Sequence, residues 1–533
     1  MQALETYRHW LVGAFFGAYF LLGLWVLPDY GVGWDEPNQR NHGIVTVDYL
    51  NSKFGWYEGK FKPEADLLTY EFRHYGMLFQ MACFAVERWL GLESFRENHL
   101  LRHYGVFLVF WLGSIAFYRW LLHRYRNWRW ALLGTLLLVL SPRIFAHSFF
   151  NIKDSILLAS YAFGSLTLWN FFEKRNWQTA VLHGLGSALA INARIVGVFL
   201  PAITLAWLAL DFLLARQKWG HLRKNAPLLA VYAVSLSALT VLFWPYLWEN
   251  PIGHLKEAFE VMGKYEWGGE VLIWGERFWA RSSLPWWYAP SWILVTVPVL
   301  YTVLALSGMT RIVGGFFRRT RPWISFGWYA DRERRFDAMA LSLFLLPILI
   351  VIYKNSTLYD GWRQLHFVYP PFVALAMSGL AWWTQKLRPA VVWTITALCL
   401  AITAGHMIRI HPYQQASFNF LAGENRLMRF DQDYWGISYK QAYEELLRRD
   451  ARECFTVYGL NFPAEANYYF LPDYARQHIR FLNGEDPDAD YYLTNYRGHW
   501  DRDRYNRKKG PFKEELFAIT VDGTKILGVY KLK

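Results

Sequence analysis

The sequence has few cysteines, few charges and no repeats. Its three cysteines, Cys83, Cys399 and Cys454, lie far apart, and no CxxC or Cys/His spacing typical of a metal site occurs. They therefore give no information on the compartment. Charged residues make up only 19% of the chain and hydrophobic residues 54%, which is too apolar for an ordinary soluble enzyme of this size. There is no internal repeat and no low-complexity linker.

The composition indicates a membrane part joined to water-facing parts, because the mean hydropathy is only +0.06. Trp (29) and Tyr (33) are abundant, and both favour the interface between lipid and water. The net charge of +13 falls largely in short loops between apolar runs, a distribution that argues against a nucleic-acid partner.

Eleven apolar runs approach the length that crosses a bilayer, about 17–25 residues. They are 9–27, 100–122, 129–141, 154–172, 177–192, 195–214, 226–247, 289–310, 337–353, 365–383 and 390–409. The first lacks a small-residue cleavage site, so we expect a retained span. The run 129–141 is short, and only Ala193-Arg194 separates 177–192 from 195–214, which form either two spans or one bent helix. The count therefore lies between about ten and twelve.

Basic residues in the loops set the orientation. They are Arg119, Arg124, Arg126, Arg129, Lys174, Arg175, Arg216, Lys218, Arg223, Lys224, Arg311, Arg318, Arg319, Arg321, Arg332, Arg334, Arg335, Lys386 and Arg388. If eleven runs cross, all of these loops lie on one side, which the positive-inside rule assigns to the cytoplasm. The opposite side receives the loops 28–99, 142–153 and 248–288 and everything after 410.

We therefore predict an all-α polytopic membrane domain over 1–410 and a small extracytoplasmic α/β domain over 411–533. The first outer loop, 28–99, includes an amphipathic helix at about 75–90 that lies on the membrane. In the tail we expect a helix at 438–449, strands at 454–458 and 490–495, and a hairpin over 516–531 that turns at Asp522-Gly523.

Two adjacent carboxylates follow the first apolar run in the stretch Trp34-Asp35-Glu36-Pro37. Such a pair can hold a divalent cation, or one carboxylate can act as a general base while the other orients it. Taken alone, a helix cap before Pro37 is the more frequent role for such a pair.

The stretch 141–154 gathers ionisable groups between two predicted spans: Arg143, His147, Lys153 and Asp154. Ionisable groups at membrane depth are costly and are more often functional than not. Arg143 and Lys153 suit a phosphate, and Asp154 could hold a metal or pair with Lys153. The alternative is a loop whose charged side chains pair with one another and extend to the aqueous phase.

Three further clusters lie on the same predicted face: Arg73 with His74, Arg194 alone, and Tyr359-Asp360 with Arg363 and His366. Arg73 and His74 could neutralise an anion or contact lipid headgroups. Arg194 either reaches water from a turn or, within a bent helix, needs an anionic partner. Arg363 and His366 are close to one helical turn apart, although the neighbouring aromatics could equally form an interface belt.

The acidic pair, the stretch 141–154, Asp360-Gly361-Trp362-Arg363 and Asp433-Tyr434-Trp435-Gly436 together give a resemblance. Over roughly 10–410 the chain resembles membrane glycosyltransferases of the C-type (GT-C) fold that use polyprenyl-phosphate sugars. It is similar in pattern to the protein O-mannosyltransferases (family 39) and the bacterial aminoarabinose transferases acting on lipid A. It departs from the latter at Arg73-His74-Tyr75, where a His-Pro-Pro-like stretch is replaced, and its tail lacks the eukaryotic sugar-binding insert, so a protein acceptor is not implied.

The resemblance implies an inverting glycosyltransferase that moves a hexose or pentose from a polyprenyl-phosphate donor to lipopolysaccharide, another envelope glycan or a protein. It places the catalytic acid at Asp35, the second acidic position at Glu36 and the second-loop acid at Asp154. We expect Arg143, Lys153, Arg194 or Arg363 to bind the donor phosphate. The remaining cavity candidates are Trp34, Arg73, His74, His147, Asp154, Tyr359, Asp360 and His366.

A divalent cation (Mg²⁺ or Mn²⁺) at Asp35 and Asp154 is compatible with this mechanism but not required by it. We expect the protein in the inner (plasma) membrane, with the site and the tail on the periplasmic side. A transporter or lipid flippase is the main alternative, and a non-enzymatic scaffold with the tail as binding module is a third. The sequence leaves the sugar, the acceptor and the oligomeric state open.

Overall fold

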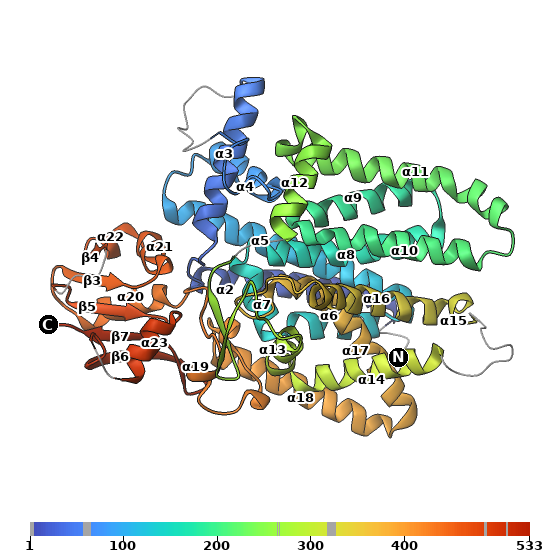
Figure 1. Cartoon of the computed structure of the whole chain (residues 1–533). Helices are drawn as coiled ribbons and strands as arrows, with labels where there is room; N and C mark the ends of the chain where they lie inside the picture. Colours follow the sequence, from blue (N-terminus) through green and yellow to red (C-terminus); the bar gives the residue numbers. More distant parts are fainter. Residues whose placement is uncertain are drawn as a thin grey trace.

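A computed structural model describes residues 5–56, 66–263, 265, 267–316, 327–483, 488–507 and 510–533. Arg318, Arg319 and Arg321, part of the predicted basic loops, lie outside these residues. Long helices run side by side in one bundle, and a small sheet domain stands at one end of it (Figure 1).

Every predicted apolar run corresponds to a helix. The bundle contains α2 (Arg8–Val26), α5 (Phe95–Tyr125), α6 (Trp128–Val139), α8 (Asp154–Lys174), α9 (Trp177–Ala193), α10 (Phe199–Leu214), α11 (Lys218–Phe243), α14 (Val299–Phe316), α16 (Arg332–Tyr353), α17 (Tyr369–Lys386) and α18 (Pro389–Arg409). Within the described residues, nine helical segments are long and apolar enough to cross a membrane, and a bent pair brings the number to ten. α9 has only 17 residues but packs between α8 and α11. The chain is a multi-pass membrane protein.

The breaks between helices refine the prediction. Arg194 is extended (φ −159°, ψ 145°) and ends α9, so the predicted runs on either side are two helices and not one bent helix. The run 289–310 is divided into α13 (Tyr288–Thr296) and α14. The predicted turn 142–153 is largely a buried helix, α7 (Pro142–Phe150), which bends by 72° from α6. Proline suits the first turn of a helix, which explains why α7 begins at Pro142.

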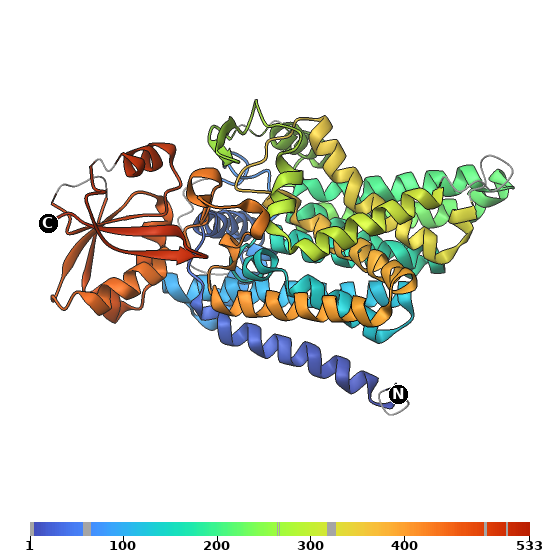
Figure 2. The same ribbon diagram turned by 90° about the horizontal axis from the view of Figure 1, so that it is seen from below.

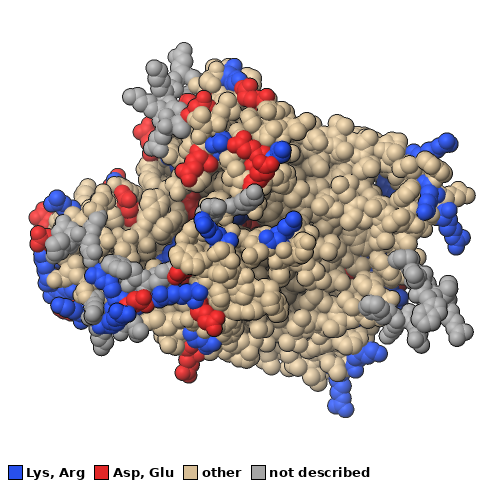
Figure 3. Space-filling view, in the orientation of Figure 1, with Lys and Arg blue, Asp and Glu red and all other residues tan. Residues whose placement is uncertain are grey.

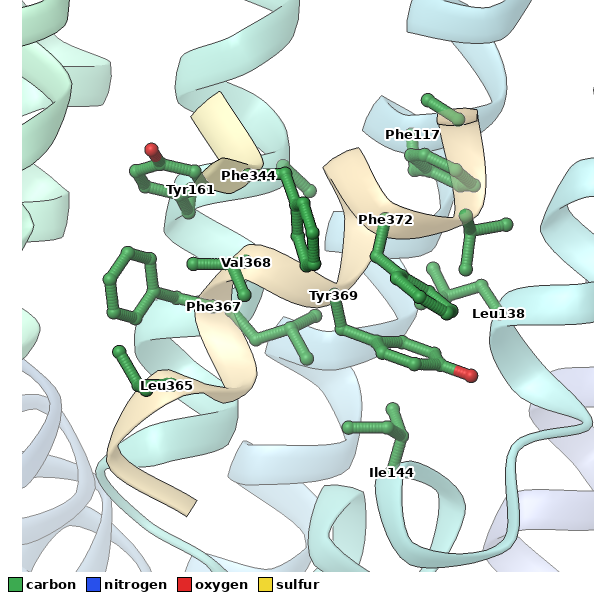
Figure 4. Packing of buried hydrophobic residues seen from close by; sticks show 14 of the residues in the cluster. Phe117, Leu138, Ile144, Tyr161, Phe344, Leu365, Phe367, Val368, Tyr369 and Phe372 are labelled. Carbon is green, nitrogen blue, oxygen red and sulfur yellow. The ribbon is translucent and has the colours of Figure 1, made fainter. Parts of the chain in front are cut away.

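Aromatic and aliphatic side chains fill the centre of the bundle (Figure 4). Tyr369 and Phe372 of α17 stack with ring centroids 5.4 Å apart, and Ile144 of α7 and Leu138 of α6 lie near them. α14 and α17 approach so closely that a Cβ at Gly379 would collide with the backbone of Leu304. Small residues permit such contacts between membrane helices.

Charged side chains are unevenly distributed over the surface. On the face seen in Figure 3, a wide belt of the bundle is almost free of charged residues. Charges cover the sheet domain and its junction with the bundle, and those visible at the opposite end of the bundle are Lys and Arg. This distribution matches an apolar belt in lipid with basic loops at one end.

The C-terminal domain has a five-stranded sheet in the order β4-β3-β5-β7-β6. Its strands are β3 (Phe455–Gly459), β4 (Ile479–Leu482), β5 (Tyr491–Thr494), β6 (Glu514–Val521) and β7 (Thr524–Lys531), and its helices are α20 (Tyr439–Arg449), α21 (Phe462–Phe470), α22 (Asp473–Arg476) and α23 (His499–Asn506). β3 pairs in parallel with β4 and β5, whereas β7 is antiparallel to β5 and β6. The predicted hairpin is confirmed, with Asp522 (φ 50°) and Gly523 (φ 76°) at its turn.

Several side chains of the segment between the last membrane helix and the sheet pack into the core of the bundle. Phe418, Phe430 and Trp435 are buried in the same cluster as the membrane helices. The elements that pack on the sheet begin with α20, whose N-cap residue is Ser438.

The remaining elements lie between the helices of the bundle and in the segment after α18. They are α3 (Glu36–Phe54), α4 (Leu78–Leu90), α12 (Pro251–Gly263), α19 (Arg426–Arg429) and the hairpin of β1 (Glu270–Ile273) and β2 (Glu276–Trp279), while α15 (Gly327–Ala330) precedes α16. α4 matches the predicted amphipathic helix.

Candidate active site

Asp35 lies at the start of α3, where the sequence predicts a helix beginning near Pro37. Within the described residues, its carboxylate makes no capping hydrogen bond. Instead, its Oδ2 lies 3.3 Å from Lys153 Nζ and 3.1 Å from Arg363 Nη1. The side chain remains 20% exposed, so a ligand can reach it. Helix capping therefore does not explain why this carboxylate is present.

Arg363 joins three carboxylates. Its Nη1 lies near Asp35 and also 3.5 Å from Asp154 Oδ2, while its Nη2 lies 3.4 Å from Asp360 Oδ2. The rings of Trp435 and Tyr359 are 4.6 Å and 4.9 Å from the guanidinium carbon. Arg363 is 3% exposed. Such a buried guanidinium is fixed by its neighbours, which suits a group that must hold a defined position.

Asp154 is the first residue of α8, where the helix dipole favours a negative charge. Asn151 holds it on both sides: Asn151 Nδ2 donates to Asp154 Oδ2 at 2.9 Å, and Asp154 N donates to Asn151 Oδ1 at 2.9 Å. Arg194 forms an ion pair with Asp154. Arg194 thus lies at a turn and has an anionic partner as well.

The cluster carries more positive than negative groups. Four cations (Lys153, Arg194, Arg363 and Arg497) are paired with three carboxylates (Asp35, Asp154 and Asp360). These seven residues carry one more positive than negative charge, which an anion such as a phosphate would compensate.

The surroundings shift the pKa values of the groups outside the helices. Burial raises the pKa of Asp35, but the charges of Lys153 and Arg363 outweigh it, so the pKa lies below its usual range. Burial lowers the pKa of Lys153, which Asp35 partly offsets. Burial raises the pKa of Asp360, against the effect of Arg497.

Glu36 faces away from Asp35 and is fully buried. Its Oε1 accepts from Gly33 N at 2.7 Å, and its Oε2 lies 2.9 Å from His103 Nε2. These contacts fix the turn that precedes α3. Glu36 can therefore position Asp35 through the backbone, but it does not line the same space.

Three predicted residues lie apart from the cluster. Arg73 Nη2 and His74 Nε2 bind Glu257 Oε1 of α12, at 2.8 Å and 2.9 Å. Arg143 donates from Nε to the carbonyl oxygen of Ser417 at 3.0 Å, and its guanidinium lies 4.5 Å from the ring of Phe418. The first two hold an outer loop, and Arg143 ties α7 to the segment before the sheet.

His147 and His366 pack against each other close to Asp154. Their rings are 4.7 Å apart, and Asn151 Nδ2 lies 2.9 Å from His147 Nδ1. Both are buried. Asn151 thus links this histidine pair to Asp154.

Aromatic residues also pack around the cluster. Trp267 stacks on Tyr359 with centroids 4.6 Å apart, and Tyr265 lies 6.3 Å from the same ring. Lys153 Nζ is 4.7 Å from the ring of Tyr75. Aromatic faces of this kind pack well against sugar rings and lipid chains.

Sequence reasoning missed several contributors. Arg497 of the tail binds Asp360 Oδ1 at 2.8 Å and lies over Trp34 at 4.4 Å from its ring. Nothing in the polar sequence around Arg497 distinguishes it. Trp435 belongs to a stretch that the resemblance includes, and Tyr75 and Asn151 lie within or beside predicted clusters, so these signals were partly present.

The segments around Asp35 and Trp435 are joined by close backbone contact. Trp34 N donates to Trp435 O at 3.2 Å, and a Cβ at Gly31 would collide with the carbonyl of Ile437. Glycine is required for this approach. The residues before α3 are thus held against the segment that leads into the sheet.

An apolar groove begins at Lys153. It has a volume of about 600 Å³ and lies between α4, α5, α8 and α9. Gln39, Lys153 and Asn192 line it together with apolar residues such as Ala82 and Leu189, and Arg119 also borders it. The groove therefore joins the charged cluster to an apolar space of the bundle.

The predicted cation pair Asp35 and Asp154 fits a metal ion poorly. Each carboxylate is already paired with basic side chains. Among the residues that the structure describes, no group of three or more His, Cys, Asp or Glu side chains is placed to hold a metal ion.

No protein-family model matches the sequence, and no curated protein sequence matches it. Among solved structures, the chain is similar to ArnT from Cupriavidus metallidurans in its apo state, with 14% identity, 98% of each chain covered and a TM-score of 0.51. The same protein bound to undecaprenyl phosphate gives 14% identity, 98% coverage of each chain and a TM-score of 0.49. The oligosaccharyltransferase of Archaeoglobus fulgidus tethered with an acceptor peptide gives 12% identity over 90% of this chain and 64% of that one, with a TM-score of 0.47. Because the first match covers 98% of each chain, the predicted resemblance is confirmed at the level of fold: the chain has the C-type (GT-C) fold of membrane glycosyltransferases.

Proposed function

We propose that this chain is an inverting glycosyltransferase that moves a sugar from a polyprenyl-phosphate donor to an extracytoplasmic acceptor. The observation that carries this proposal is the position of Lys153. Its ammonium pairs with Asp35, and its side chain lines the mouth of the apolar groove. One residue thus connects a carboxylate suited to act as a base with a space suited to a lipid chain.

The groove and the charged cluster match the two ends of such a donor. An isoprenoid chain is apolar and favours burial in the groove between α4, α5, α8 and α9. A phosphate at its mouth would meet Lys153 and Arg363, and Arg194 stands behind Asp154. Guanidinium and ammonium groups bind phosphate through charge-assisted hydrogen bonds.

In the reaction, the carboxylate of Asp35 takes the proton of an acceptor hydroxyl. The hydroxyl oxygen forms a bond to the anomeric carbon from the face opposite the phosphate. The bond from the anomeric carbon to the phosphate oxygen breaks, and its electron pair remains on the lipid phosphate. Lys153 and Arg363 stabilise the negative charge of the leaving phosphate, and each such donor typically contributes a few kcal/mol. This geometry inverts the anomeric centre.

The ion pairs of Asp35 give the donor a second role. Without donor, Lys153 and Arg363 lie at 3.3 Å and 3.1 Å from Asp35 and keep it a weak base. A bound phosphate would share both cations, and the basicity of Asp35 would rise. Donor binding would then activate the base, which limits proton removal in the absence of substrate.

The acceptor remains one of three classes: lipopolysaccharide, another envelope glycan or a protein. We place the site on the periplasmic side of the inner membrane, because the basic loops lie at the other end of the bundle. Trp34, Trp267 and Tyr359 are half-buried beside the cluster, and we propose that the acceptor enters past them.

A transporter or flippase is the second candidate, since it would also bury charged groups in a bundle. Transporters usually consist of paired repeats with sites near mid-membrane, whereas these charges gather at one end of the groove. The test is to incubate the purified protein with polyprenyl-phosphate hexose and polyprenyl-phosphate pentose and to measure free polyprenyl phosphate. We expect slow release without acceptor from one donor. A donor that is carried across the vesicle membrane with its glycosidic bond intact would favour the transporter. If neither release nor transport occurs, a scaffold would be favoured.

A further inference from the structure

A second cavity separates α2 from α5 at the end of the bundle where the chain starts. It has a volume of about 770 Å³. α2 lies against the bundle near the sheet domain and diverges from it towards the N-terminus (Figure 2). The space around the glycines of α2 shows the same divergence. A Cβ at Gly23 would collide with the ring of Phe107 of α5, whereas no neighbouring atom lies within 4 Å of a Cβ at Gly13 or Gly17.

The walls of the cavity are apolar along its depth. Val12 and Phe16 of α2 face Trp111 and Ile115 of α5. At the narrow end, Trp111 Nε1 donates to the carbonyl oxygen of Phe16 at 3.0 Å. Since Gly13 also lines this space, it is wide enough at that level for a hydrocarbon chain to lie against the helix backbone.

The mouth of the cavity is basic. Arg8, Arg119 and Arg126 line it, together with a single acidic residue, Glu5. Glu5 Oε1 already accepts from Trp128 Nε1 at 3.1 Å and from Arg129 Nη2 at 3.3 Å. Among the described residues, neither Arg119 nor Arg126 has an acidic partner within ion-pair distance. Three positive charges thus lie at the open end of this second cavity, which we call the α2–α5 groove.

We propose that this groove binds an anionic glycerophospholipid of the leaflet that adjoins the basic loops. The headgroup phosphate would lie between Arg8, Arg119 and Arg126, and one acyl chain would lie along Gly13 and Gly17. Basic pockets between membrane helices bind anionic headgroups in this manner. The site is distinct from the first groove, because α5 lies between the two and only Ile115 and Arg119 border both.

Charge and geometry favour a lipid over a second copy of this chain. A second copy would bring the same three arginines to the mouth and add repulsion. Gly13 and Gly17 line the space between α2 and α5, where a lipid chain fits more readily than a whole helix, about 10–12 Å across.

The experiment uses the full-length protein, delipidated in detergent, and native mass spectrometry to count bound lipids. The probes are phosphatidylglycerol, phosphatidylcholine with the same acyl chains, and inorganic phosphate. Arg119→Gln with Arg126→Gln removes the basic mouth, and Arg216→Gln with Lys218→Gln is its control, because both residues belong to a basic loop outside the groove. Gly13→Leu fills the groove, and Gly405→Leu of α18 is its control, because no atom lies within 4 Å of a Cβ there either.

We expect the wild type and both controls to retain one phosphatidylglycerol at least tenfold more tightly than phosphatidylcholine. Arg119→Gln with Arg126→Gln should lose this preference, and Gly13→Leu should retain less phosphatidylglycerol than Gly405→Leu. Both variants should remain folded. Equal retention by Gly13→Leu and Gly405→Leu would overturn the proposal. So would equal binding of the two lipids, displacement by inorganic phosphate, which would indicate a soluble anion, or a wild-type dimer that Gly13→Leu dissociates.

Discussion

Arg363 Nη1 lies 3.1 Å from Asp35 Oδ2 and 3.5 Å from Asp154 Oδ2, so one nitrogen joins the carboxylate that precedes α3 to the carboxylate at the start of α8. Arg363 and Asp35 are 328 positions apart in the chain. This contact ties the start of α3 to the approach to α17. In the proposed mechanism, the same guanidinium holds the base before the donor binds and the phosphate afterwards.

Replacement of Arg363 should separate its structural role from its chemical one. Arg363→Gln leaves Asp35, Asp154 and Asp360 without their shared counter-ion, and the loss of one partner of a buried pair costs about 3–5 kcal/mol of unfolding free energy. Arg363→Lys keeps the charge but cannot reach all three carboxylates. We expect a lower Tm for Arg363→Gln, and a folded Arg363→Lys with turnover reduced at least tenfold. Exposed Arg216→Gln is the control. Wild-type turnover in Arg363→Lys would argue against a role in catalysis.

The pH dependence of turnover should report the ion pairs of Asp35. The pKa of Asp35 in the free protein lies below its usual range, so the acid limb of kcat/KM should lie below about pH 4. If the donor phosphate draws Lys153 and Arg363 away, the acid limb of kcat should lie at higher pH, since kcat reports the complex. Coincident acid limbs for the two parameters would contradict this account.

Acid should also destabilise the protein through the same group. A carboxylate with a depressed folded-state pKa contributes stability that is present above its unfolded-state pKa and is lost as the pH falls through the folded-state value. The contribution of Asp35 should thus disappear below about pH 4. Denaturant unfolding of the wild type and Asp35→Asn over this range should converge at low pH, whereas a constant difference between them would contradict the assignment.

The donor groove can be filled without a change at the charged cluster. Ala82 lines the groove from α4, and Ala82→Phe should obstruct the lipid chain. Val86, one turn further along α4, is exposed outside the groove, and Val86→Phe is the matched control. We expect KM for a long-chain donor to rise about tenfold in Ala82→Phe only, in line with the loss of a buried apolar contact. The measurement is repeated with a short-chain donor, for which both variants should resemble the wild type. An equal rise for both donors would place the groove outside the donor site.

The sheet domain should influence the site through Arg497. This residue binds Asp360 at 2.8 Å and lies over Trp34. Arg497→Gln should reduce kcat about tenfold while the domain stays folded. Asp360 would lose one of its two basic partners, and its changed position would displace Arg363. Arg480→Gln on β4, an exposed position of the same domain, is the control. Equal kcat in the two variants would show that the domain acts independently of the site.

Much of the fold could be predicted because membrane helices need long apolar runs. All eleven runs correspond to helices, and the hairpin at Asp522-Gly523 follows from its turn residues. The four-residue strand β4 (Ile479–Leu482) was not predicted, although the equally short β5 (Tyr491–Thr494) was, because the hydrophobic pattern of such short runs does not distinguish a strand from other structure. The sequence did not indicate that Phe418 and Trp435 pack into the core of the bundle, because they lie in a segment without a long apolar run.

The site was predictable in part for a related reason. Charged residues at membrane depth are rare, so Lys153, Asp154, Arg194 and Arg363 were conspicuous, and the structure brings them together. Residue type alone does not reveal where a side chain points. Glu36, for example, is adjacent to Asp35 but faces His103. Arg497 is one of many arginines in a polar tail, and only the tertiary fold brings it to Asp360.

The central claim is that Asp35 is the base of a glycosyl transfer, and one comparison tests it directly. Wild type, Asp35→Asn and Asp48→Asn, a control on the same helix α3, are incubated with the polyprenyl-phosphate sugar that the wild type cleaves. Donor binding and release of polyprenyl phosphate are measured on each sample. Asp35→Asn should bind the donor with less than a threefold change and lose at least a thousandfold in release, whereas Asp48→Asn should match the wild type. Retained release in a folded, donor-binding Asp35→Asn would contradict the account.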